Sequence, residues 1–146
     1  MKVYLASDHA GFELKNKVKD YLISLNYEIE DMGDFAPIPT DDYPDFIAKA
    51  SEKVSNDPSS RAIVFGKSGA GEEIVANKFK NVRAILGFSN ENVVLGRKDN
   101  DANVLSLGYE FVDVQKAFEL VKLFLETPFS KEERHKRRIE KISKLE

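Results

Sequence analysis

One glycine-rich loop in the chain has the residue types that suit the binding of an anion. The loop, Gly66-Lys67-Ser68-Gly69-Ala70-Gly71, stands between an apolar run typical of a buried strand and a segment with helical spacing. Glycines leave backbone N–H groups uncovered, and the start of the following helix adds positive electrostatic potential. We therefore expect this loop to receive an anion. The alternative is a glycine turn that only leads the chain into the helix.

Two nucleotide-binding motifs do not fit this loop. The triplet Gly66-Lys67-Ser68 resembles the end of a P-loop, but that motif needs a glycine five positions before Gly66, where this chain has Arg61. The glycine spacing also differs from the dinucleotide-binding fingerprint, which follows the first strand of its fold rather than the third. The expected anion is therefore not a nucleotide.

Two glutamates, Glu72 and Glu73, follow the loop directly. Successive residues of a helix point about 100° apart, so only one of the two can face a crevice at the loop. Glu72 is the nearer and is the candidate for a general base. The alternative is that both glutamates only complement the positive end of the helix dipole.

Polar side chains also follow the first apolar run, and a basic cluster lies near the end of the chain. Asp8 and His9 could cap a turn or line a ligand site, and the residues favour neither interpretation. Arg134 and Arg138 stand four residues apart, on one face of a helix, where two guanidinium groups suit a phosphate. A solvated basic face paired with nearby glutamates is the alternative.

Strand-like and helix-like segments alternate along the whole chain. Apolar runs predict strands over 3–6, 27–31, 62–65, 83–88 and 103–107. Helical spacing predicts helices over 12–25, 43–54, 72–79, 90–97 and 111–125, and then a charged helix over 130–144. Five such units predict an α/β fold, a Rossmann-like three-layer αβα sandwich with a five-stranded parallel sheet. The ligand crevice of such sheets lies beyond the carboxyl ends of the strands, where the glycine loop and Asp8-His9 are expected.

The composition restricts the chemistry. A length of 146 residues with 42% hydrophobic content predicts a single domain over 1–146. The chain has no cysteine, which excludes disulfides, thiolate metal sites and a cysteine nucleophile. It has two histidines, His9 and His135, too few for a histidine-rich metal site within one chain. A carboxylate site for a hard cation remains formally open, but we expect no metal.

Charge and hydropathy argue against two classes of partner. The net charge of −3 divides into +3 over 130–146 and −6 over the rest, and an acidic body argues against general nucleic-acid binding. No stretch approaches the roughly 20 apolar residues of a membrane span, and the N-terminus does not have the pattern of a signal peptide. We therefore expect a cytoplasmic protein with no membrane partner.

Several separated motifs lie along nearly the whole chain. They are Ala6-Ser-Asp-His-Ala-Gly-Phe-Glu-Leu-Lys, Asp42-Tyr-Pro-Asp, Gly69-Ala-Gly-Glu with Ala76-Asn-Lys-Phe, Arg97-Lys-Asp-Asn-Asp-Ala-Asn, and Pro128-Phe followed by Arg134-His135 and Arg138. In this order the motifs resemble the B-type ribose-5-phosphate isomerase family, whose members also isomerise allose 6-phosphate and galactose 6-phosphate. One branch of the family uses a cysteine at position 66 as the base, and this chain, with Gly66, resembles the branch that uses a glutamate at position 72.

The resemblance implies an aldose–ketose isomerase that needs no cofactor and no metal. Glu72 would be the base, Ser68 would help to hold the enediolate, and the backbone of Lys67, Gly69, Ala70 and Gly71 would form an anion hole. The resemblance further implies that Asp8, Tyr43 and Asn100 contact the sugar and that His9, Arg134 and Arg138 contact the phosphate. Family members are homodimers with sites at the interface, so the segment around Asp99 and Asn100, and the basic helix over 130–144, would reach the partner subunit.

Two positions depart from the family pattern. Asp99 stands where the family usually has the histidine that opens the sugar ring, and Glu110 stands where many members carry an arginine that binds phosphate. An aspartate serves more readily as a base than as an acid at neutral pH. Ribose 5-phosphate is the expected substrate. The alternatives are a hexose 6-phosphate, or a protein that binds a sugar phosphate without catalysis.

Overall fold

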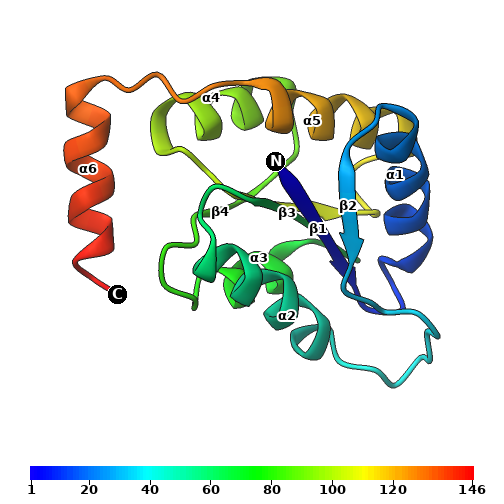
Figure 1. Ribbon diagram of the computed structural model, residues 1–146. Coiled ribbons are helices and arrows are strands. Elements are labelled where there is room, and N and C mark those ends of the chain that lie inside the picture. Colours follow the sequence, from blue (N-terminus) through cyan, green and yellow to red (C-terminus); the bar gives the residue numbers. More distant parts are fainter.

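The five strands form one parallel sheet in the order β2-β1-β3-β5-β4 in the computed structural model, which describes all 146 residues (Figure 1). The strands are β1 (Lys2–Ser7), β2 (Glu28–Asp31), β3 (Arg61–Gly66), β4 (Ala84–Leu86) and β5 (Val104–Gly108). In the parallel pairing of β1 with β3, Val3 lies opposite Arg61 and Ser7 lies opposite Phe65. The carboxyl ends of these two strands therefore lie at the same edge of the sheet. The predicted five-stranded parallel sheet is confirmed.

Helices cover both faces of the sheet. They are α1 (Phe12–Ser24), α2 (Tyr43–Asn56), α3 (Ala70–Ala76), α4 (Asn90–Asn100), α5 (Val114–Glu126) and α6 (Glu133–Ser143). Val3 and Leu5 of β1 belong to the core beneath α1, α4 and α5, whereas Tyr4 and Ala6 belong to the core beneath α2 and α3. This alternation follows from the two-residue period of a strand. The predicted three-layer arrangement is therefore confirmed.

All six predicted helices are observed, but several predicted boundaries are wrong. The helices expected over 43–54, 90–97 and 130–144 span Tyr43–Asn56, Asn90–Asn100 and Glu133–Ser143. The helix expected over 72–79 begins at Ala70 and ends at Ala76. The helix expected from Phe111 begins at Val114, because the Asp113 side chain accepts a hydrogen bond from the N–H of Lys116 at 2.8 Å and so caps the helix there. Phe111 lies outside that helix and is 71% exposed, so it is not part of the buried stripe.

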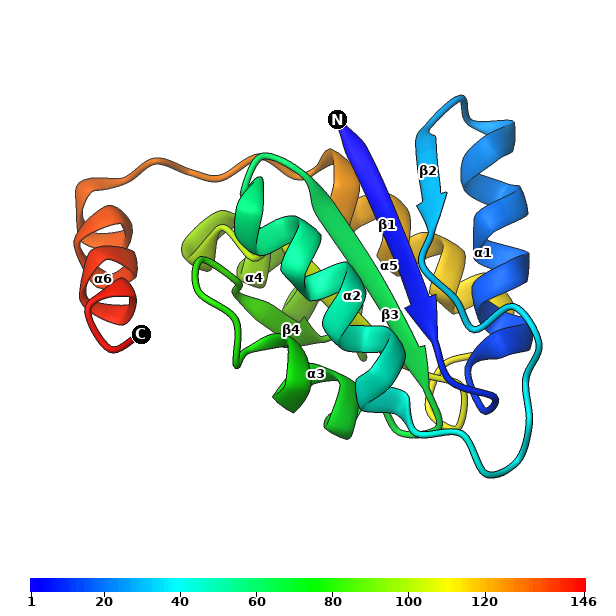
Figure 2. The same cartoon turned by 60° about the horizontal axis from the view of Figure 1, so that its bottom comes forward.

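The last helix, α6, stands apart from the sheet at the end of an extended segment (Figures 1 and 2). Its only buried residue is His135, which faces α4. Figure 2 shows that the arrowhead of β1 points away from α6. The basic helix predicted over 130–144 is thus observed as α6. It lies toward the amino ends of the strands, away from their carboxyl ends. None of the six helices has the length and apolar content needed to cross a membrane.

Candidate active site

The glycine loop connects the end of β3 to the start of α3. Gly69 adopts a φ of +81°, a left-handed conformation that favours glycine, and this turn brings the chain into the helix. The Ser106 hydroxyl donates a hydrogen bond to the carbonyl of Gly69 at 2.7 Å, and the N–H of Glu110 donates to the carbonyl of Lys67 at 3.1 Å. The neighbouring strand and its following turn thus hold the loop in place.

Several backbone N–H groups of the loop are free to bind a ligand. Those of Lys67, Ser68 and Gly71 donate no hydrogen bond to another group of the chain. The N–H of Ala70 donates to the Ser68 hydroxyl at 3.2 Å, which orders the turn. Free N–H groups at the start of a helix form a site for an anion.

The Glu72 side chain turns back from the first turn of α3 toward the end of β3. Glu72 is only 4% exposed, and its carboxylate fills the space beside Gly66 so closely that a Cβ atom at position 66 would overlap it. Burial raises the pKa of the Glu72 carboxyl, and the negative charge of Asp8 adds to the rise, while the backbone N–H groups of Glu72 and Gly69 oppose it. The result is a carboxylate with raised basicity, as a general base requires.

Glu73 points in another direction. Its Oε1 accepts a hydrogen bond from the N–H of Leu86 at 3.1 Å, so the side chain joins α3 to the end of β4. The two glutamates therefore diverge as predicted from helix geometry, with only Glu72 beside the loop.

Asp8 and Tyr43 lie near Glu72 and the glycine loop. Asp8 is 7% exposed and its Oδ1 accepts a hydrogen bond from the N–H of Gly11 at 3.1 Å, so it orders the turn after β1 as well as facing Glu72. Tyr43 is the first residue of α2, and its ring packs against Gly71, where a Cβ atom would come within 2.7 Å of the hydroxyl oxygen. The turn after β1, the start of α2 and the glycine loop thus meet near Glu72.

A pocket of about 590 Å³ opens next to the turn after β1. His9 and Lys67 both line it, together with residues of α1 and of the turn that precedes α5. Lys67 is 68% exposed and its Nζ lies 3.8 Å from the Glu110 carboxylate. The Glu110 carboxylate therefore lies next to Lys67, which lines this pocket.

The remaining predicted site residues lie elsewhere in the chain. Asp99 and Asn100 are at the C-terminal end of α4, and the His135 Nε2 of α6 lies 3.4 Å from Asp99 Oδ1. Arg134 is exposed and its Nε donates to Glu132 at 2.8 Å. An 11-residue helix is about 16 Å long, and α4 begins at the carboxyl edge of the sheet, so Asp99 at its far end does not reach Glu72 of the same chain. Arg134 and Arg138 belong to α6, which contacts that far end and stands apart from the sheet (Figure 2).

Asp41 joins His9 in the structure, although no sequence pattern predicts it as a site residue. The Asp41 side chain accepts a hydrogen bond from the His9 ring at 2.5 Å, although the two residues lie 32 positions apart. No periodic pattern marks the segment between β2 and α2, so only the folded chain brings Asp41 to His9.

Comparisons with known proteins agree with this geometry. The model of the family described as Ribose/Galactose Isomerase matches residues 3–142. Ribose-5-phosphate isomerase B of Mycolicibacterium paratuberculosis is 41% identical over 146 residues, which are 100% of this chain and 92% of that protein. The corresponding protein of Mycobacterium tuberculosis strain H37Rv is 39% identical over 100% of this chain and 90% of its own length.

Solved structures match nearly the whole chain. Ribose-5-phosphate isomerase B of Mycoplasma genitalium, solved with bound ribulose-5-phosphate, has a TM-score of 0.95 at 34% identity and covers 99% of this chain and 95% of that one. The enzyme of Thermotoga maritima has a TM-score of 0.92 at 38% identity and covers 98% of this chain and 97% of that one. The full-length matches and the buried glutamate behind the glycine loop lead to one conclusion: the chain belongs to the ribose/galactose isomerase family.

Proposed function

We propose that the protein interconverts ribose 5-phosphate and ribulose 5-phosphate, with Glu72 as the base. The observation that carries the proposal is the buried Glu72 carboxylate of raised basicity, which lies beside Gly66 at the start of a loop with free N–H groups. The names of the relatives and the ribulose-5-phosphate bound to the Mycoplasma genitalium enzyme support this substrate.

The reaction moves two protons. The Glu72 carboxylate removes the proton from C2 of the open-chain aldose, the C1=C2 double bond forms, and the C1 oxygen takes the negative charge of a cis-enediolate. The N–H groups of the loop from Lys67 to Gly71, with the Ser68 hydroxyl, stabilise that charge, and one such donor is typically worth about 3 kcal/mol. Glu72 then returns its proton to C1, while the proton on O2 passes to O1 and leaves the carbonyl at C2.

The other groups at this edge of the sheet bind the substrate. Asp8, whose charge acts on Glu72, and Tyr43, whose ring packs at Gly71, contact the sugar hydroxyl groups. His9 and Lys67 line the adjoining pocket and attract the phosphate. The Lys67 ammonium, next to Glu110, takes over part of the role that an arginine at position 110 has in many members of the family.

A second copy of the chain completes the site. Asp99, Asn100, Arg134 and Arg138 lie too far from Glu72 to act in the same subunit, and all four belong to α4 or α6. In the proposed homodimer they reach the partner's glycine loop, where the arginines bind phosphate and Asp99 transfers protons during ring opening. Large apolar side chains that are exposed on α3, α4 and α6 support a covered surface there: Ile74, Leu95 and Ile142.

The test combines substrate range with one pair of variants. A coupled assay compares ribose 5-phosphate with allose 6-phosphate and galactose 6-phosphate, and we expect the highest kcat/KM for the pentose. Glu72→Gln keeps the shape of the side chain but cannot accept the proton, so kcat should fall at least about 10²-fold. Glu73→Gln is the matched control, because this side chain faces β4 and should leave turnover unchanged.

The pH dependence provides a second check of the base. Protonated Glu72 cannot accept a proton, so kcat should fall as the pH drops through its raised pKa. Near-normal turnover of Glu72→Gln would refute the assignment of the base, and absence of turnover on all three sugars in the unaltered protein would refute the isomerase.

A further inference from the structure

The segment between β2 and α2 passes over the carboxyl end of β1 and carries Asp41 to His9 (Figure 1). Two hydrogen bonds, both at 2.8 Å, join the start of this segment to β1. The N–H of Ser7 donates to the carbonyl of Gly33, and the N–H of Asp34 donates to the carbonyl of Ser7. The fully buried Lys15 ammonium also donates to the carbonyl of Asp34 at 2.7 Å. The approach of Asp41 to His9 is therefore built into the fold.

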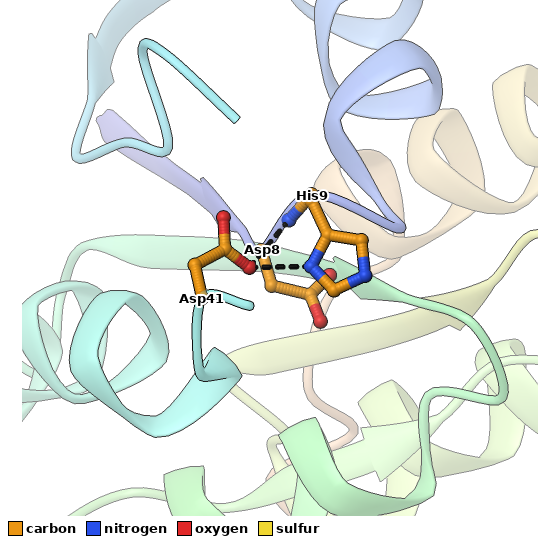
Figure 3. A group of neighbouring side chains, drawn as sticks. All are labelled: Asp8, His9 and Asp41. Carbon is orange, nitrogen blue, oxygen red and sulfur yellow. Dashed lines mark hydrogen bonds and ion pairs between the residues drawn. The ribbon is translucent and has the colours of Figure 1, made fainter. Parts of the chain in front are cut away.

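A single oxygen atom of Asp41 accepts two hydrogen bonds from His9. Its Oδ1 accepts a hydrogen bond from the His9 backbone N–H at 3.1 Å and from the ring Nδ1 at 2.5 Å (Figure 3). The Asp41 side chain is only 8% exposed, and its Oδ2 accepts from the N–H of Ile38 at 3.4 Å. Because Oδ1 is an acceptor, the Nδ1 atom of His9 carries a proton. Figure 3 shows the other ring nitrogen of His9 turned away from Asp41.

The charges around the ring favour its protonated form. The hydrogen bond that the His9 ring donates to Asp41 raises the pKa of His9 most, and the negative charges of Asp41, Asp8 and Asp34 add to the rise. Burial opposes ionisation of Asp41, but its interactions with Asp34 and His9 outweigh this cost and hold its pKa at about 2. The other charged groups that line the adjoining pocket carry both signs: Glu13, Lys17, Lys67 and Asp113.

We propose that Asp41 is a positioning residue that fixes the orientation of the His9 ring and keeps its positive charge, so that Nε2–H is presented to the anionic end of the substrate. Identifying that anion as a sugar phosphate rests on the proposed function. Asp41 itself contacts neither the phosphate nor the reacting carbons in this account, and it acts only through His9.

The proposal has a pH signature that a merely structural role lacks. A histidine without a partner loses its charge near pH 6.5, whereas one paired with a carboxylate keeps it to higher pH. Removing the Asp41 charge should therefore weaken phosphate binding at pH 8, where an unpaired imidazole is neutral. At pH 6 the ring remains mostly charged with or without Asp41.

The first measurement is an NMR titration of the His9 ring in the whole protein. His135 is the only other histidine, and His9→Asn assigns the signals. We expect His9 to titrate above pH 6.5 in the unaltered protein and roughly one pH unit lower in Asp41→Asn. Asp42→Asn removes the same charge one residue away, with no contact to the ring, and should leave the titration unchanged. Equal titration of His9 in the Asp41→Asn and unaltered proteins would overturn the proposal.

The second measurement is KM for ribose 5-phosphate at two pH values. Relative to the unaltered protein, KM of Asp41→Asn should rise roughly fivefold or more at pH 8 and less than twofold at pH 6, with kcat unchanged. An equal rise at both pH values would show a structural role only and would overturn the proposal.

Two outcomes separate this proposal from the proposed function. If Asp41→Asn does not fold, titration of His9 at or below pH 6.5 in the unaltered protein overturns the proposal, and titration clearly above it supports the proposal. The NMR experiment does not require turnover. A protein that isomerises no sugar would refute the proposed function, and the titration would still decide whether Asp41 pairs with His9.

Discussion

If each active site combines Glu72 of one subunit with the α6 arginines of the other, two inactive variants should restore each other's activity. The α4 helix places Asn100 about 16 Å from the carboxyl edge of the sheet, and α6 lies beyond it. A five-carbon sugar phosphate in contact with Glu72 therefore cannot reach Arg134 or Arg138 of the same chain. In a two-fold symmetric dimer the partner presents these residues from the opposite direction.

The expected recovery follows from counting sites. Glu72→Gln removes the base, and the double variant Arg134→Ala/Arg138→Ala removes two exposed guanidinium groups without disturbing the core. A heterodimer of the two variants contains one site with all the changes and one site with none. Its activity per dimer should therefore be about half that of the unaltered dimer, although each variant homodimer is nearly inactive below KM.

Heterodimers purified through two different affinity tags allow a direct assay with ribose 5-phosphate at a concentration below KM. Each homodimer carries the same tags as a control for their effect. If Glu72 and the arginines act in the same subunit, every site of the heterodimer is defective, and activity at the level of the homodimers would refute the shared site.

Three further outcomes follow from the same geometry. Gly66→Ala should lower kcat by about 10²-fold in a steady-state assay, because the added Cβ displaces the Glu72 carboxylate from its position; unchanged kcat would contradict this. Arg138→Ala should raise KM roughly tenfold for ribose 5-phosphate but not for unphosphorylated ribose, and equal losses for both would indicate a structural helix. Asp99→Asn should lower turnover on sugars that are mostly cyclic and spare a substrate without a ring form, whereas equal turnover of cyclic sugars by Asp99→Asn and the unaltered protein would remove Asp99 from ring opening.

The sheet and the glycine loop were predictable because their signals are local. Apolar runs such as 62–65 bounded by turn residues identify buried strands, and parallel strands place their carboxyl ends together. The boundaries were less predictable. The left-handed Gly69 lets α3 begin before Glu72, and Asp113 caps α5 after Phe111, and both effects depend on loop geometry rather than on periodicity.

The pairing of Asp41 with His9 was not predictable, because it depends on how a segment without periodicity crosses the sheet. The separation of Asp99 from Glu72 was expected only from the family resemblance, which implies that the segment around Asp99 reaches the partner subunit. The structure gives the physical reason, because α4 carries Asp99 from the carboxyl edge of the sheet to the opposite edge. A list of motifs along the chain therefore does not say which residues share a site.

The relation between Gly66 and Glu72 shows what the fold adds to residues that the sequence already identifies. In the sequence, Gly66 is one glycine of a glycine-rich loop and Glu72 is one acidic residue at the start of a helix. In the structure the two positions share one volume, because the Glu72 carboxylate occupies the space that any side chain at position 66 would need. A cysteine at position 66 and a glutamate in this orientation at position 72 therefore exclude each other sterically. If Glu72 is the base, as proposed, Gly66 is required for catalysis because it leaves room for the Glu72 carboxylate.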